Sequence, residues 1–134
     1  MAGRRGMRET VLYYNPAPSG NVMKLKGILV RMGVRIKNVT LEQAGETIES
    51  LLGLTEGGST AEMEAGAASI EDEVLVLHQF SSSRLDELLL NLRKAGVPRI
   101  ALKAVVTESN IKWTFYQLYR EIKDEHEKMQ GNNQ

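Results

Sequence analysis

The chain has 134 residues, of which 42% are hydrophobic and 25% charged, as expected for a single folded domain. It has no cysteine, which excludes disulfides, thiolate catalysis and cysteine-ligated metal sites, and its net charge of zero gives no indication of nucleic-acid binding. No apolar run reaches the roughly 20 residues of a membrane-spanning helix, and no secretory segment follows the basic start, so we expect a cytoplasmic protein without a membrane partner.

Charge is distributed unevenly along the chain. Residues 1–37 carry eight basic side chains against Glu9 alone, whereas residues 38–83 carry nine acidic side chains and neither lysine nor arginine. This asymmetry indicates either a partner-binding surface or two solvated faces that partly neutralise each other.

The chain begins with a strand and a helix. Residues 10–14 (TVLYY) are almost continuously apolar, which is typical of a strand buried on both faces. After a turn-rich loop, apolar residues recur at helical spacing over residues 22–32. We expect Ser19 or Asn21 to cap this helix and Gly33 to end it.

A second strand and helix follow. Basic and apolar residues alternate over 34–39, which indicates a strand, and Thr40 with Gln43 fits a capping box for a helix that ends at Gly53. Residues 54–70 are rich in Gly, Ala, Ser, Thr and Glu without a clear period, and we interpret them as a mobile acidic loop.

The third strand is the apolar run at residues 74–77, and Ser81 is a candidate cap for the helix after it. Gly96 supplies the stop of that helix, whose inward stripe has four leucines. These are Leu85, Leu88, Leu89 and Leu92.

The fourth strand is expected over residues 100–106, interrupted by the charge of Lys103. Thr107 and Asn110 form a possible reciprocal cap for a long final helix. The apolar stripe of that helix is Ile111, Phe115, Leu118 and Ile122.

We therefore expect a disordered arm at residues 1–8, one α/β domain at 9–129 and a frayed tail at 130–134. No internal repeat is visible at the periods of solenoid proteins. Alternation of strands and helices predicts a four-stranded, mainly parallel, Rossmann-like sheet with helices on both faces. A ferredoxin-like arrangement is the main alternative, but it requires a hairpin that the sequence does not show.

Strand composition predicts the strand order. The first and third strands are wholly apolar and belong in the centre, while lysine or arginine in the second and fourth is typical of edges. Right-handed crossovers then give the order 2-1-3-4, with the first and fourth helices on one face and the second and third on the other.

Such a sheet predicts a ligand site where the strand order reverses, outside the carboxyl ends of the first and third strands. Loops rich in side-chain oxygens lead there into helix N-termini, which favour a phosphate or carboxylate. The candidate ligand-binding residues are Asn15, Ser19, Asn21, His78, Ser81, Lys103, Thr107, Asn110 and Trp113. Ordinary helix capping explains most of these residues equally well.

Several of these residues have a simple structural interpretation as well as a functional one. His78 would need an orienting carboxylate and a nucleophile to act as a base, and no acidic residue is placed for a triad. Lys103 could point at an anion or extend from an edge strand, and Trp113 could stack on a ligand or close the core. We predict no catalytic residue, no metal site and no cofactor, since the two histidines are far apart and no dinucleotide or Walker motif is present.

The segment from Val74 to His126 resembles a bacterial family, the Domain of Unknown Function 3783 family. The resemblance depends on the apolar strand, the Leu-Asp-Glu-Leu-Leu helix and Lys103-Ala104 with Thr107, Asn110 and Trp113. It implies a cytosolic bacterial protein and brings no reaction, cofactor or partner. It also links Lys103, Thr107, Asn110 and Trp113 as one group.

Together these patterns favour a non-catalytic domain that binds a small anionic molecule. The alternative is a protein–protein interaction module or homo-oligomer that uses the charge asymmetry and the long final helix. An enzyme of the hydrolase type built on His78 is the third possibility, and nucleic acid is the least expected partner.

Overall fold

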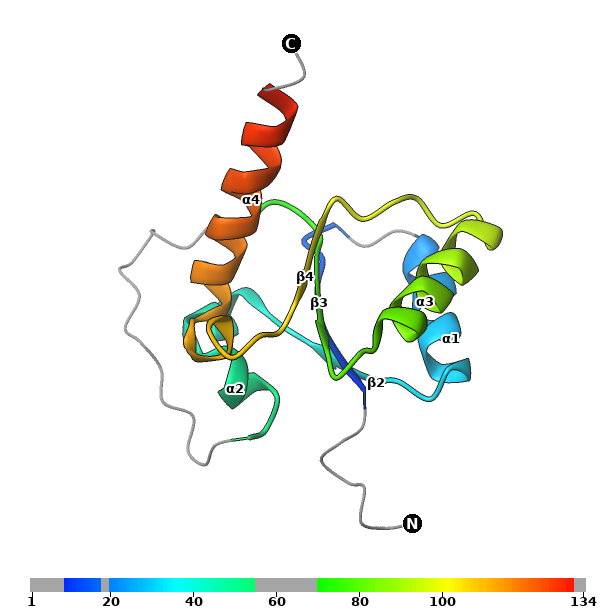
Figure 1. Cartoon of the computed structure of the whole chain (residues 1–134), viewed down its shortest axis with the longest axis horizontal. Helices are drawn as coiled ribbons and strands as arrows, with labels where there is room; N and C mark the ends of the chain where they lie inside the picture. The colour runs from blue at the N-terminus through cyan, green and yellow to red at the C-terminus, as the bar shows by residue number, and fades with distance from the viewer. Residues whose placement is uncertain (1–8, 18–19, 55–69, 132–134) are drawn as a thin grey trace.

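The computed structural model describes residues 9–17, 20–54 and 70–131 (Figure 1). The expected arm at 1–8, most of the acidic loop at 54–70, Ser19 and the last three residues lie outside this range. Residues 130 and 131, expected in the tail, belong to the last helix.

A four-stranded sheet forms the centre of the molecule. It consists of β1 (Thr10–Tyr14), β2 (Arg35–Asn38), β3 (Val74–His78) and β4 (Leu102–Val105) in the order β2-β1-β3-β4. The predicted α/β class and strand order are confirmed, and the β1–β2 and β3–β4 pairs are parallel. The central pair is antiparallel, with Thr10 opposite His78 and Tyr14 opposite Val74.

Helices cover both faces of the sheet, as predicted, but in a different distribution. One face packs against α1 (Asn21–Arg31) and α3 (Ser82–Lys94), and the other against α2 (Ile48–Leu51) and α4 (Phe115–Gly131) (Figure 1). The assignment of the first and fourth helices to one face is therefore wrong. The expected distribution assumed that β3 and β4 run parallel to β1, but they run in the opposite direction. A right-handed β3–α3–β4 crossover then places α3 on the same face of the sheet as α1.

The capping predictions are partly correct. Ser81 caps α3, and its Oγ accepts the amide hydrogen of Arg84 at 3.2 Å. The cap of α1 is Gly20, and Asn21 is the first residue of the helix.

Each of the two predicted capping boxes encloses a short 3-10 turn instead of opening a long helix. These turns are η2 (Leu41–Gly45) and η3 (Asn110–Lys112). The helices α2 and α4 start later, at a second threonine: Thr47 Oγ1 accepts from Ser50 N–H at 3.2 Å, and Thr114 Oγ1 accepts from Gln117 N–H at 3.0 Å.

The two halves of the chain repeat the same order of elements: strand, helix, strand, 3-10 turn and helix. The segments VTLEQAGETIESL (39–51) and VTESNIKWTFYQL (106–118) align without a gap and share both threonine caps. Equivalent residues of the two segments, such as Thr40 and Thr107, are separated by more residues than a solenoid repeat contains. The repeat is therefore not visible at the periods of solenoid proteins.

The halves meet about an approximate two-fold axis normal to the sheet. An antiparallel pair has such symmetry, and Leu12 opposite Val76 marks its centre. On the α2 and α4 face the contact is also reciprocal: Ile48 N–H donates to the carbonyl of Trp113 at 2.8 Å, and Phe115 N–H donates to the carbonyl of Glu46 at 3.0 Å. Equivalent positions thus exchange equivalent hydrogen bonds.

Phe115 is the largest fully buried side chain at this junction and contacts the ring of Tyr14 at 6.3 Å between centroids. We expect Phe115→Ala to lower the free energy of unfolding by about 3–5 kcal/mol, because it removes apolar contacts and leaves a cavity. Urea denaturation followed by circular dichroism measures this loss.

The control is Met23→Ala, since Met23 is 80% exposed and its loss should change stability by less than about 0.5 kcal/mol. Equal effects of the two substitutions would contradict the burial of Phe115 in the core.

Candidate functional site

The antiparallel pairing of β1 and β3 separates the residues that the sequence assigned to one crevice. β1 ends where β3 begins, so the loops that follow these two strands lie at opposite ends of the sheet, measured along the strands. Asn15 and Asn21 lie at one end, whereas His78 and Ser81 lie at the other. The expected crevice requires the two strands to be parallel, and the structure does not form it.

At the end of the sheet where β1 finishes, a hydrogen-bonded network joins β1 to the residue before β3. Tyr13 donates its hydroxyl hydrogen to Glu73, and Asn15 Nδ2 donates to the Tyr13 oxygen at 2.9 Å and to Glu73 Oε2 at 3.4 Å. Burial, and then the bond to Glu73, raise the pKa of Tyr13 to about 12, so this phenol stays protonated. Asn15 and Asn21 line a small cavity of about 160 Å³ here, together with Glu73.

At the opposite end of the sheet, the side chains of Thr107 and Asn110 form hydrogen bonds with backbone N–H and carbonyl groups after β4. Thr107 N–H donates to Asn110 Oδ1 at 2.8 Å, Asn110 N–H donates to Thr107 Oγ1 at 3.1 Å, and Asn110 Nδ2 donates to the carbonyl of Val105 at 3.1 Å. With Asn110 only 9% exposed, its side chain is occupied by the fold. Both residues thus act as caps in this structure.

His78 ends β3 and is half-buried, and burial lowers its pKa. Over the described parts of the chain, no carboxylate forms a hydrogen bond or ion pair with its imidazole. The geometry gives no orienting group of the kind that a general base requires.

Lys103 and Trp113, which the resemblance links, lie on opposite sides of the sheet. Trp113 packs half-buried against the core under α4. Lys103 is in register with Leu75, whose side chain belongs to the core under α1 and α3. The structure therefore separates Lys103 and Trp113 and leaves Lys103 in different surroundings.

Those surroundings are a groove of about 430 Å³ along the open side of β4, which we call the β4 groove. The C-terminal half of α3, the connection after it and β4 supply its walls. Its lining is Leu89, Leu92, Arg93, Val97, Pro98, Arg99, Ile100 and Lys103. These are five apolar and three cationic side chains, and no acidic side chain is among them.

Lys103 carries an incompletely compensated charge in this groove. Its Nζ donates to the carbonyl of Ile100 at 2.6 Å, and burial followed by the positive charge of Arg99 lowers its pKa. A bound anion would favour the charged ammonium and accept its remaining hydrogens. The site thus has the chemistry of an anion site bordered by apolar surface.

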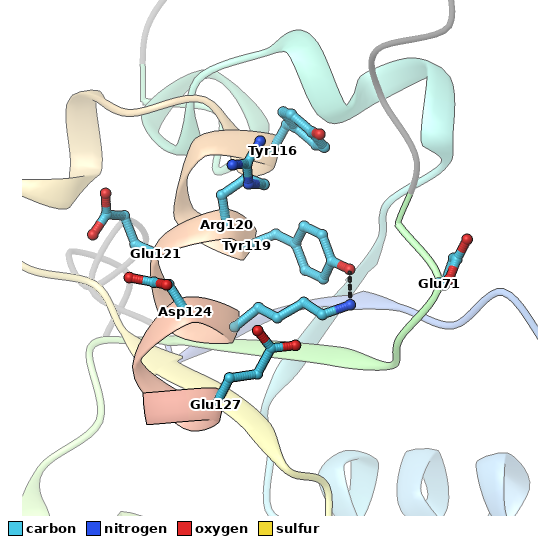
Figure 2. A pocket seen from close by; sticks show the side chains of 8 residues that line it. Glu71, Tyr116, Tyr119, Arg120, Glu121, Asp124 and Glu127 are labelled. Atoms are coloured by element: carbon cyan, nitrogen blue, oxygen red, sulfur yellow. Dashed lines mark hydrogen bonds between the residues drawn. The ribbon is translucent and has the colours of Figure 1, made fainter. Parts of the chain in front are cut away.

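A larger groove on α4 has the opposite character. It lies beside Tyr116 and Tyr119, and its lining mixes two cations with four carboxylates (Figure 2). The cations are Arg120 and Lys123, and the carboxylates are Glu71, Glu121, Asp124 and Glu127. Lys123 is already engaged, because its Nζ donates to Asp72 at 3.0 Å. It also donates to the Tyr119 hydroxyl at 3.2 Å, which is the dashed bond in Figure 2.

A third groove, about 510 Å³, lies between α1 and α3. One of its three lining cations, Arg84, donates to Glu9 at 2.8 and 2.7 Å and to the carbonyl of Met32 at 2.5 Å. This arginine joins the start of the first half to the helix of the second. Arg84 also pairs with Glu87, a carboxylate that lines this groove, whereas the lining of the β4 groove has no carboxylate. The β4 groove is therefore the better candidate for an anion.

The first half of the chain does not reproduce the β4 groove. Alignment at the helix-ending glycines Gly33 and Gly96, both at positive φ, places Val30 opposite Arg93. Alignment of the second strands places Ile36 opposite Lys103. Only Val34 separates Gly33 from β2, whereas residues 97–101 separate Gly96 from β4. The groove therefore arises from a longer connection and from cations particular to the second half.

The sequence singled out Lys103 as a candidate, but not Arg93 or Arg99, which line the same groove. Arg93 lies at the end of α3, where a basic residue is ordinary, and Arg99 lies in a connection without regular structure. The available indication was the spacing Arg93, Arg99, Lys103 around Pro98, with no acidic residue between Glu87 and Glu108.

Comparison with known proteins addresses the same half of the molecule. Residues 73–129 match the model of DUF3783, a domain of unknown function. This confirms the resemblance inferred from residues 74–126. The DUF3783 segment spans β3 to α4 and includes every residue that lines the β4 groove. Searches among curated proteins and among solved structures gave no match.

Among the residues that the structure describes, no cluster of three or more histidine or acidic side chains could hold a metal ion. No helix in these ranges is long and apolar enough to cross a membrane.

The acidic block seen in the sequence is partly neutralised by the second half of the chain. Glu49 pairs with Lys112 at 3.3 Å, and Asp72 pairs with Lys123 at 3.0 Å. Burial acts to raise the pKa of Asp72, but the hydrogen bonds from Lys123 and Tyr119 outweigh it and lower the pKa overall.

We expect Asp72→Asn to destabilise the protein near neutral pH by at most about 1 kcal/mol, because Asp72 and Lys123 are both partly exposed. A lowered folded-state pKa gives stability that is present above the unfolded pKa, near 3.9, and lost as the pH falls through the folded value. The difference from wild type should therefore shrink below about pH 4 in urea denaturation.

Asp86→Asn on the exposed side of α3 is the matched control and should change stability by less than about 0.5 kcal/mol. A difference between wild type and Asp72→Asn that persisted undiminished at pH 2 would rule out the charge contribution.

Proposed function

We propose that this protein binds a small anionic molecule with an apolar part, without converting it chemically, and that the β4 groove is the binding site. The observation that carries the proposal is the set Arg93, Arg99 and Lys103 around an apolar floor with no acidic lining residue. The anionic group would contact the cations, and the apolar part would lie on the floor.

The size and lining of the groove support a small molecule. Its volume of about 430 Å³ falls within the range of roughly 300–1,000 Å³ that is usual for such ligands. Its apolar residues include Leu92 and Ile100, which also belong to the buried core. A floor fixed by the core is preformed, which reduces the ordering cost of binding.

The lining also supports binding rather than conversion. Its polar side chains are two arginines and one lysine, with no carboxylate, imidazole or hydroxyl. Hydrolysis or acyl transfer needs an activated nucleophile or a general base beside the ligand. Lys103 fits the role of an anion contact, because its Nζ is held by a backbone carbonyl and lies near a second cation.

An interaction module that uses the charge asymmetry is the less supported alternative. Glu49 and Asp72, two of the acidic residues that create the asymmetry, already pair with lysines of the same chain. These pairs partly neutralise the acidic block on which the alternative depends.

Hexyl phosphate, below its aggregation concentration, is a suitable probe in a two-dimensional NMR titration of the full chain. We expect amide shifts concentrated at Leu92, Val97, Ile100 and Lys103, whereas hexanol at equal concentration should give much smaller shifts because it lacks the anionic group. Lys103→Met keeps the aliphatic stem and removes the charge, so we expect binding about tenfold weaker, or ~1.4 kcal/mol.

Lys24→Met is the matched control, because Lys24 is an exposed lysine of α1 that lines none of the three grooves or the small cavity described above. This variant should bind as the wild type does. The proposal would be abandoned if hexyl phosphate left the β4 groove amides unmoved or if both lysine variants bound alike.

A further inference from the structure

The β4 groove has a neighbouring compartment of different chemistry. This is the cavity of about 160 Å³ at the end of β1, lined by Asn15, Asn21 and Glu73 among others. Val97 and Pro98 line both spaces, so the connection between α3 and β4 forms a shared wall. One space presents cations and the other presents a carboxylate.

The sheet places Glu73 and Lys103 on the same face. Lys103 is opposite Leu75 on β3, and Glu73 lies two positions before Leu75, so both side chains point toward the α1 and α3 layer. A strand spacing of about 4.8 Å and a rise of about 3.3 Å per residue put their Cα atoms about 8 Å apart. A molecule of modest length can reach both.

The hydrogen bonds around Glu73 define what the smaller compartment accepts. Tyr13 and Asn15 both donate to Glu73, and Asn15 donates to Tyr13 as well. These donors hold the carboxylate in place, and the described residues form no ion pair with it. A half-buried carboxylate that has no ion-pair partner among the described residues favours a cationic hydrogen-bond donor such as an ammonium group.

We infer that the two spaces take the two ends of one zwitterionic ligand, with its anionic group at Arg93, Arg99 and Lys103 and its ammonium group at Glu73. The apolar middle of the ligand crosses Val97 and Pro98. This inference rests on the proposed function and narrows its ligand class from anions to amino-bearing anions.

Two probes that differ only in an amino group test this assignment. Hexyl phosphate carries the anion alone, and 6-aminohexyl phosphate adds an ammonium group at the far end of the same chain. On the wild-type protein we expect the amino group to tighten binding about fivefold, because it adds a charge-assisted hydrogen bond to Glu73. The Glu73 and Asn15 resonances should shift with 6-aminohexyl phosphate only.

Glu73→Gln separates the two contacts. Glutamine keeps an acceptor for Tyr13 and removes the charge, so the advantage of 6-aminohexyl phosphate should vanish while hexyl phosphate binds unchanged or slightly more tightly. Glu125→Gln, an exposed residue of α4 outside the grooves, should behave as the wild type. An unshifted spectrum away from residue 73 shows that Glu73→Gln remains folded.

The outcomes distinguish the two proposals. Binding of hexyl phosphate in the β4 groove with no gain from the amino group, or a gain that survives Glu73→Gln, overturns the zwitterion assignment and leaves the anion site standing. Absence of binding by both probes overturns both.

Discussion

The antiparallel pairing of β1 with β3 is the contact on which the rest of this structure depends. It joins two strands that are buried on both faces, and it reverses the second half of the chain relative to the first. This reversal places α1 and α3 on one face of the sheet. On the other face it allows the reciprocal backbone hydrogen bonds that Ile48 and Phe115 donate. The molecule is thus two similar halves held about one approximate two-fold axis.

The candidate site lies where the two halves differ. The longer connection after Gly96 opens a space beside β4, and Arg93 and Lys103 stand where the first half has Val30 and Ile36. The first half therefore has an apolar residue at each of the two positions that carry these cations in the second half.

The same connection separates two kinds of electrostatic environment. On one side, Lys103 lies beside Arg99 with only a backbone carbonyl as its hydrogen-bond acceptor among the described residues. On the other, Tyr13 and Asn15 orient the carboxylate of Glu73. Both charges are half-buried, where a ligand charge interacts more strongly than at an open surface. The arrangement favours recognition by charge pattern over recognition by shape alone.

The sequence by itself determined the strands, their order, the bounds of α1 and α3 and the cap at Ser81, because these follow from local periodicity and local hydrogen bonding. The capping residues Thr40 and Thr107 were also visible in the sequence, but they enclose 3-10 turns and do not open α2 and α4. The repeated Val-Thr segment was also present in the sequence, at a spacing longer than the one searched. Only the tertiary structure decided the direction of β3 against β1, since an apolar strand buried on both faces satisfies either pairing equally well. That single choice separated Asn15 from His78, because which side chains share an end of the sheet depends on strand direction rather than on composition. The meeting of Arg93, Arg99 and Lys103 depended instead on how the connection between α3 and β4 folds, which no local periodicity specifies.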